Sequence, residues 1–186
     1  MVESTKKKLA AIMFSKFVEF EKYLAEDESF AVKILSDHDK YLDEQINLYS
    51  GRVIKHIDET VFVEFVSSTD AVNCALAIHN SLLKHNSQNS ESYQINVQIG
   101  IHMGEVHEKD RDLFGDGVNL ASRIQPLAKK SGTVSSQAVY NAIRSDKNIF
   151  VRDMGRVSLK NIKEPERVFK IYLDKIEYKK ETDNQL

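Results

Sequence analysis

Tryptophan is absent from this sequence, proline occurs only twice, and there is a single cysteine. One cysteine cannot form a disulfide within the chain, which excludes the cross-linked architecture of small secreted domains. Cys74 lies in the segment DAVNCALAIHNSLL, where small and aliphatic residues recur at helical spacing. We therefore predict that Cys74 is a small buried packing residue rather than a reactive thiol.

The sequence also lacks an excess of charge of either sign and lacks a long hydrophobic run. Its 26 basic and 28 acidic residues leave a net charge of -2. Such a balance gives no general attraction to nucleic acid or to an anionic membrane surface. The apolar run in MVESTKKKLAAIMF is too short for a signal peptide or a membrane span. We expect a cytoplasmic protein with no membrane segment and no nucleic-acid partner.

The 41% of hydrophobic residues are enough to form one substantial core. The chain length suits one domain rather than two, and we place that domain at residues 1–174. Residues 175–186 are rich in charge and poor in apolar side chains. We predict that this tail is flexible.

Strands and helices alternate along the first two thirds of the chain. KLAAIMF is an apolar run of strand length, and residues 28–49 carry apolar side chains on one helical face. RVIKHI and VFVEF flank Asp58, Glu59 and Thr60 at hairpin spacing, and a helix is predicted at about 69–85. YQINVQIGIHMGEV then alternates as a long strand. This βαββαβ order folds most simply into a ferredoxin-like antiparallel sheet with two helices on one face.

The remaining segments extend this sandwich. GVNLASRI opens another helix, which Pro126 should end or kink. FVRDMGRVSLK and RVFKIYL read as further strands. The predicted fold class is therefore α+β, a βαββαβ sandwich with an added C-terminal αβ extension.

The segment DLFGDGVNLASR, residues 112–123, is the most specific in the chain. A turn flanked by glycines leads directly into a helix that carries Asn119 and Arg123 four residues apart, on one face. This arrangement aims an amide and a guanidinium at one point. In contrast, the histidines are not at metal-ligand spacing on any one element, so structural roles are expected for His38, His56, His102 and His107.

With this segment in place, the sequence resembles the class III nucleotidyl cyclase domain, the family of adenylyl and guanylyl cyclases. The likeness covers nearly the whole chain. KLAAIMF matches the first strand of the family, GRVIKHI and VFVEF match its hairpin, GIHMGEV its central strand, and LKNIKEPERVFKIY its closing strands. The resemblance implies conversion of ATP to cyclic AMP and pyrophosphate.

The resemblance also implies roles for five residues. Lys55 and Asp112 match the lysine and aspartate that recognise adenine, Asn119 matches the asparagine that orients the ribose, Arg123 the arginine that stabilises charge on the reacting phosphate, and Lys160 a lysine that contacts the triphosphate. An ammonium donates to a ring nitrogen of adenine, and a carboxylate accepts from its exocyclic amine. Guanine presents the reverse pattern, so ATP is favoured over GTP. At Lys160 the sequence LKN departs from the more usual LKG.

The positions that should hold the metal ions are altered. The family uses two ions, Mg²⁺ or Mn²⁺, held by two aspartates in patterns like F-[TS]-D-x-x-G and K-x-x-G-D. Here Lys16 stands at the first aspartate and Glu19 at the glycine that follows it, whereas Asp58 stands at the second glycine and Glu59 at the second aspartate. An ammonium has donors only and cannot coordinate a cation. We predict a Lys16–Glu59 ion pair in place of the metal bridge, and repulsion of phosphate by Glu19.

Three functions remain open on these residues. The favoured one is a domain that binds adenine nucleotide or completes the site of a metal-bearing partner, as a homodimer or a heterodimer, with little activity of its own. The second is an active adenylyl cyclase in which Lys16 extends to solvent and Glu59 holds one ion. The third is a dimerisation module whose cleft residues are relics.

Overall fold

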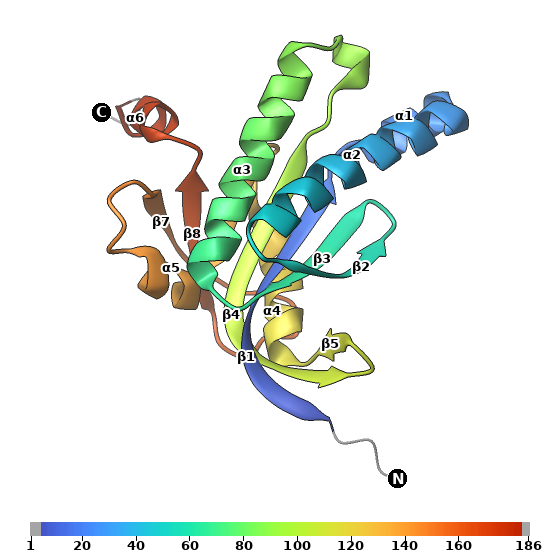
Figure 1. The fold of residues 1–186 in the computed structure, drawn as a ribbon. Coiled ribbons are helices and arrows are strands. Elements are labelled where there is room, and N and C mark those ends of the chain that lie inside the picture. The colour runs from blue at the N-terminus through green and yellow to red at the C-terminus, as the bar shows by residue number, and fades with distance from the viewer. Residues whose placement is uncertain (1–4, 184–186) are drawn as a thin grey trace.

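The structure is a computed structural model and describes residues 5–183. Its centre is a mixed sheet in the order β2-β3-β1-β4-β6-β8-β7, with β5 paired to β4 (Figure 1). The strands are β1 (Lys6–Phe17), β2 (Arg52–Ile57), β3 (Thr60–Phe65), β4 (Val97–Lys109), β5 (Asp112–Phe114), β6 (Gly132–Ser136), β7 (Phe150–Val157) and β8 (Glu166–Tyr172). Strand β1 is antiparallel to both β3 and β4, and β4 is parallel to β6. The predicted βαββαβ order is confirmed.

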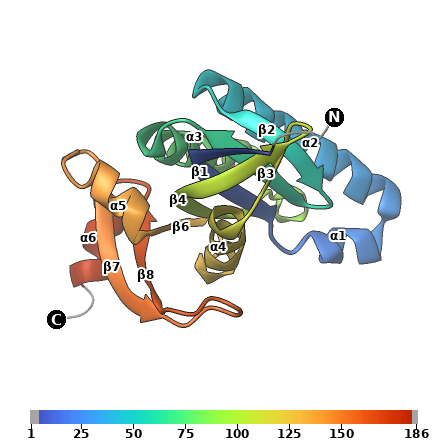
Figure 2. The same cartoon turned by 90° about the horizontal axis from the view of Figure 1, so that it is seen from below.

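The helices cover both faces of this sheet. They are α1 (Phe20–Glu26), α2 (Glu28–Leu48), α3 (Ser68–Ser87), α4 (Asp116–Ile124), α5 (Gln137–Ile143) and α6 (Lys175–Asp183), with short 3-10 turns at Glu91–Tyr93 and Gln125–Leu127. Helices α2 and α3 lie on one face, and α4 lies on the other (Figure 2). At one end of the sheet, the last residues of β1 lie beside the β2–β3 turn.

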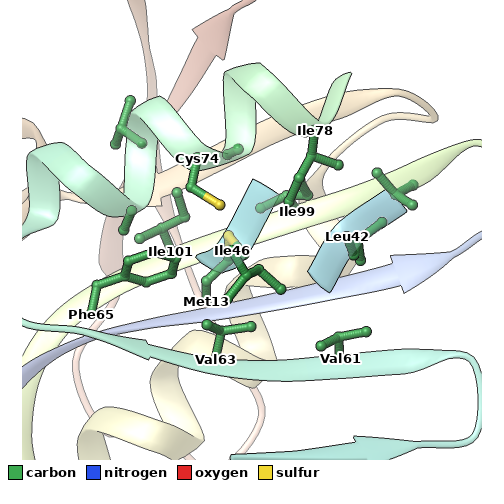
Figure 3. Close-up of a cluster of buried hydrophobic side chains, with 14 of the residues drawn as sticks. Met13, Leu42, Ile46, Val61, Val63, Phe65, Cys74, Ile78, Ile99 and Ile101 are labelled. Carbon is green, nitrogen blue, oxygen red and sulfur yellow. The ribbon is translucent and has the colours of Figure 1, made fainter. Parts of the chain in front are cut away.

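The main core lies between the sheet and helices α2 and α3. Side chains from β1, β3 and β4 meet those of the two helices there, as shown for Met13, Val63, Ile99, Leu42 and Ile78 (Figure 3). On the other face of β1, Ile12 and Phe14 pack with residues of α4. Because β1 is buried on both faces, its sequence is a continuous apolar run rather than an alternating one.

Cys74 belongs to the main core, as predicted. Its side chain is fully buried on α3 between the helix and the sheet (Figure 3). Burial raises the pKa of the Cys74 thiol to about 12. The thiol therefore stays protonated at neutral pH, which suits packing and not nucleophilic chemistry.

Polar side chains set the starts of the two long helices. The Asp27 carboxylate accepts from the amide of Phe30 at 3.0 Å and caps α2, and the Ser67 hydroxyl accepts from the amide of Asp70 and caps α3. Both satisfy amide groups that have no partner within the helix. Helix α4 ends in the 3-10 turn that contains Pro126, as its position predicted.

The C-terminal prediction is wrong over residues 175–183, which form helix α6 rather than a flexible tail. The ring of Tyr178 packs against Tyr172 and Phe150, with ring centroids 5.2 and 5.7 Å away. Glu181 pairs with Lys170 and Arg152 on β8 and β7. These partners lie on β7 and β8, outside the segment itself, so the charged composition of the segment did not reveal them. Residues 184–186 of the predicted tail lie outside the described residues.

Four other short elements were not predicted: α1, β5, β6 and α5. Each is at most seven residues long, which leaves at most two helical turns or a few strand alternations to show a pattern. Thr60 also belongs to β3, so the hairpin turn consists of Asp58 and Glu59 alone. Within the described part of the chain, no helix combines the length and apolar character that crossing a membrane requires.

Candidate functional site

The pairing of β1 with β3 brings Lys16 to the hairpin turn. Lys16 lies opposite Thr60, and the next amide, that of Phe17, donates to the carbonyl of Glu59 at 2.9 Å. The Lys16 Nζ and Glu59 Oε1 atoms are 3.2 Å apart, with 39% and 23% of the two side chains exposed. The Lys16–Glu59 ion pair expected from the sequence is therefore present.

This end of the sheet does not fit a two-metal centre. Lys16 places a cation without acceptor atoms where a carboxylate is required. Among residues 5–183, no group of three or more His, Cys, Asp or Glu side chains is arranged to hold a metal ion. The donor set of this single chain therefore disagrees with the Mg²⁺ or Mn²⁺ that the resemblance implied.

Glu19 occupies the turn that follows β1. Its backbone is left-handed, with φ 64° and ψ 17°, and it precedes the first residue of α1. Its carboxylate pairs with Lys130 at 2.6 Å and with Lys22. The hydrogen bonds from Lys130 and Lys22 lower the pKa of Glu19 to about 2. Glu19 thus remains ionised at neutral pH, and its two ion pairs restrict the rotation of its side chain.

Left-handed backbone recurs at three positions where the cyclase patterns have glycine. Glu19, Asp58 and Asn161 have φ values of 64°, 50° and 63°. Glycine adopts this conformation without strain, whereas most other residues lose about 1–2 kcal/mol in it. Three left-handed turns of this chain are therefore occupied by residues other than the glycine of the cyclase patterns.

Lys55, within β2, meets Asp112, the first residue of β5. A register irregularity between Val53 and Lys55 interrupts the β2–β3 ladder, as bulges that redirect side chains do. The Lys55 Nζ and Asp112 Oδ2 atoms are 2.7 Å apart, although 57 residues separate them. The hydrogen bond from Lys55 lowers the pKa of Asp112. The Lys55 side chain is 41% exposed and the Asp112 side chain is 50% exposed, so a ligand can reach both.

A network of four charged side chains, missed by the sequence reasoning, lies beside this pair. Lys8, Arg52, Glu64 and Glu108 come from the four adjacent strands β1, β2, β3 and β4. Lys8 contacts Glu64 at 2.6 Å and Glu108 at 2.8 Å, and Arg52 contacts the same two carboxylates at 2.7 and 2.6 Å. Arg52 also donates to the carbonyl of Arg111, in the turn just before Asp112. The network therefore supports the hairpin that carries Asp112. The charged residues that interrupt otherwise apolar strands were its only sequence signal.

Helix α4 presents Asn119 and Arg123 to solvent. Its inner side is packed very closely, because a Cβ atom at Gly117 would lie 2.6 Å from the carbonyl oxygen of Glu105. Ala121 and Ile124 are buried on that side, whereas Asn119 and Arg123 are exposed. In the described part of this single chain, neither residue forms a hydrogen bond or ion pair with Lys16, Glu59, Lys55 or Asp112. Lys160 is likewise exposed, in the turn between β7 and β8.

The histidines have structural surroundings, as their spacing indicated. His38 is buried and stacks on Phe17 at 5.2 Å between ring centroids. His102 bonds to the Ser136 hydroxyl at 2.7 Å, and burial lowers its pKa to about 4. His107 stacks on Phe114, and His56 lies within 3.6 Å of the carboxylates of Asp39 and Asp43 on α2, without any metal-binding cluster among the described residues.

Comparison with known proteins places this geometry in a family. The sequence profile of the family described as "Adenylate and Guanylate cyclase catalytic domain" matches residues 2–173. A protein of Rhizobium meliloti named "Putative adenylate cyclase 3" is 32% identical over 168 residues, which cover 90% of this chain and 29% of that protein. The kinase pkn2 of Myxococcus xanthus is 25% identical over 127 residues, which cover 68% of this chain and 15% of that protein. The chain thus spans less than a third of the length of either relative.

Solved structures agree on the fold. The adenylate/guanylate cyclase/hydrolase of Silicibacter pomeroyi superimposes with a TM-score of 0.81 at 23% identity, covering 90% of this chain and 98% of that one. The adenylyl cyclase CyaB of P. aeruginosa gives 0.79 at 20% identity, covering 91% and 96%. The profile match over nearly the whole length, together with this shared fold, shows that the chain belongs to the class III adenylyl and guanylyl cyclase catalytic domain family.

Proposed function

We propose that this chain is an adenylyl-type cyclase half-site, which recognises adenine nucleotide and makes little or no cyclic AMP by itself. In the reaction that the family implies, the ribose 3′-oxygen attacks the α-phosphorus of ATP and pyrophosphate leaves. The proposal divides the required groups into those that this chain retains and those that it has replaced.

The retained groups are those for the base and the developing charge. The 2.7 Å contact between Lys55 and Asp112 supports a common role for them, because one adenine edge can replace the contact by accepting from the ammonium and donating to the carboxylate. Asn119 and Arg123 supply an amide for the ribose and a guanidinium for the reacting phosphate. Lys160 is exposed in the turn before β8, and we propose that it contacts the triphosphate.

The replaced groups are the metal ligands, and the Lys16–Glu59 ion pair is the observation that carries the proposal. In the family, metal ions lower the pKa of the 3′-hydroxyl and neutralise the polyphosphate. With Lys16 paired to Glu59, and Glu19 held by two lysines, residues 5–183 offer no set of carboxylates for those roles.

A second chain would complete the site. Asn119 and Arg123 are exposed on α4 and separate from Lys16 and Glu59, which supports a site shared between two domains. The partner is a second copy, giving a nucleotide-binding homodimer, or a cyclase domain that carries metal ligands, giving an active heterodimer. Self-association measured by sedimentation at about 10–100 µM, the range of weak assembly, tests the homodimer, and a monomer throughout would count against it.

Calorimetry with ATP and GTP in the absence of metal tests the nucleotide site. We expect ATP to bind more tightly than GTP and expect Lys55→Met to remove the difference. Lys40→Met, at an exposed position of α2, is the matched control and should leave the preference intact. Equal affinities for ATP and GTP would refute the adenylyl assignment. Absence of nucleotide binding would favour the non-catalytic dimerisation module instead.

Activity separates the half-site from a one-metal enzyme. The unmodified protein should form essentially no cyclic AMP with Mn²⁺ and ATP, and robust activity would support catalysis with Glu59 and one ion. Combining Lys16→Asp, Glu19→Gly and Glu59→Asp restores the ligand pattern of the family. We expect measurable cyclisation only in this triple variant, because the site acts as a unit, and expect Arg123→Ala to abolish it. If a folded triple variant binds metal and ATP but stays inactive, the proposal that Asn119 and Arg123 have kept their roles in the reaction is wrong.

A further inference from the structure

A cavity of about 300 Å³ lies on the helical side of the molecule, away from the Lys55–Asp112 pair. It is bounded by α3, the segment that enters β4, the loop before β6 and the start of α6. Leu82, Ile95, Val97 and Leu173 give it an apolar interior, and the half-exposed Leu83 lies at its rim. Its volume is at the lower end of the range of small-molecule sites, about 300–1,000 Å³, so it suits a compact ligand.

Most of the polar groups around the cavity already have partners. The Asn86 side chain bonds to both backbone groups of Ile95, at 2.8 and 2.9 Å. Ser131 donates to the side-chain oxygen of Asn96 at 2.8 Å, and Glu177 accepts from the amide of Leu173 at 2.7 Å. These contacts occupy the side chains of Asn86 and Ser131, and the second oxygen of the Glu177 carboxylate lies 3.8 Å from the Lys170 ammonium, which offsets its negative charge.

His79, in the wall of the cavity, carries no charge near neutral pH. Its Nε2 atom pairs with the Thr133 hydroxyl at 2.9 Å, and burial lowers its pKa to about 4. Lys130 is therefore the one charged cation among the described residues that line the cavity.

Lys130 separates this cavity from the turn after β1. It lines both the cavity and a second pocket that contains Glu19 and Tyr23. Its Nζ atom lies 2.6 Å from the Glu19 carboxylate, and 54% of its side chain is exposed. The present partner of Lys130 is thus the Glu19 carboxylate, although Lys130 also borders the apolar cavity.

We infer that this cavity binds a compact apolar molecule bearing one carboxylate, and that the carboxylate pairs with Lys130 in place of Glu19. The apolar body fills the space between α3, β4 and α6, and the charge complements the cation at its edge. Occupation of the cavity releases one of the two lysines that hold Glu19, three residues beyond Lys16. A ligand on the helical side can therefore alter the turn at the altered metal positions. The inference concerns the single chain and does not depend on nucleotide binding.

Phenylacetate and its uncharged isostere phenylacetamide are suitable probes, titrated into the full chain without nucleotide and followed by NMR. We expect the acid to bind roughly tenfold more tightly than the amide, the size expected of a hydrogen bond to a charged group. Lys130→Met, which keeps the apolar stem, should reduce the affinity for the acid to that for the amide. Lys129→Met, a neighbouring exposed lysine that does not line this cavity, should change neither affinity.

Two further variants locate the ligand and test the exchange of partners. Leu83→Trp fills the rim at a half-exposed position and should abolish the binding of both probes. Glu19→Gln removes the competing charge and should tighten the binding of phenylacetate several-fold while leaving phenylacetamide unchanged. Equal affinity of acid and amide, no binding at millimolar concentration, or binding insensitive to Leu83→Trp would each overturn the site. An unchanged affinity for phenylacetate in Glu19→Gln would overturn the exchange at Lys130.

Discussion

Lys16→Asp is the most direct test of whether an ammonium has taken the place of a metal ion. The substitution replaces the ammonium, whose Nζ atom lies 3.2 Å from Glu59 Oε1, with a carboxylate on a shorter side chain that faces the same residue. In the absence of a cation, the attraction is lost and a repulsion between the two carboxylates replaces it.

The expected magnitude follows from the exposure of the two side chains. A partly exposed ion pair contributes at most about 1 kcal/mol, because water and salt screen it. Loss of the attraction and gain of the repulsion together should lower the free energy of unfolding by about 1–2 kcal/mol. For a chain of this size, that corresponds to a decrease in Tm of about 2–8 °C.

Mn²⁺ should reverse the effect, because a cation between two carboxylates binds the folded state and not the unfolded one. At a Mn²⁺ concentration of 100 times its Kd, the stabilisation is about 2.7 kcal/mol, enough to bring Tm to or above that of the unmodified protein. Differential scanning calorimetry in EDTA and in Mn²⁺ measures both changes.

Lys16→Met is the matched control, since it removes the ion pair without adding a carboxylate. It should lose stability slightly and respond to Mn²⁺ no more than the unmodified protein. The reasoning is refuted if the unmodified protein gains as much from Mn²⁺ as Lys16→Asp does, or if Lys16→Asp is as stable in EDTA as the unmodified protein.

Three further predictions use backbone and titration. Asp58→Gly should raise the free energy of unfolding by up to about 1 kcal/mol in a urea titration, because φ is 50° there, and Asp58→Ala should not. Since Lys130 and Lys22 lower the pKa of Glu19 from 4.5 to about 2, Glu19 contributes stability above pH 4.5 that is lost as the pH falls toward 2. The Tm difference between the unmodified protein and Glu19→Gln should shrink over that range; a constant difference would contradict the ion pairs. Burial lowers the pKa of His79 and of His102 from 6.5 to about 4, so the unfolded chain binds more protons between these values. Stability should therefore fall as the pH falls from 6.5 to 4, and replacement of His102 by Asn should reduce the slope by about one proton.

Local pattern was sufficient for the long elements. Apolar spacing predicted a helix at 28–49 and another at 69–85, and the structure has Glu28–Leu48 and Ser68–Ser87. These predictions succeeded because helices of this length repeat their apolar face several times, and because Asp27 and Ser67 supply caps within the same segment. The three-residue β5 and the nine-residue α6, which has few apolar side chains, offer no such repetition and depend on their partners.

By itself, the sequence determined the order βαββαβ, the burial of Cys74 and the presence of Lys16, Glu19 and Glu59 where the cyclase pattern has other residues, because each is encoded within a short segment. Tertiary structure decided other contacts, between side chains that lie far apart in the chain. Lys55 reaches Asp112 across 57 residues, and Lys130 reaches Glu19 across 111. Such contacts depend on strand register and on loops that close far from either residue in sequence, so periodicity and composition do not contain them.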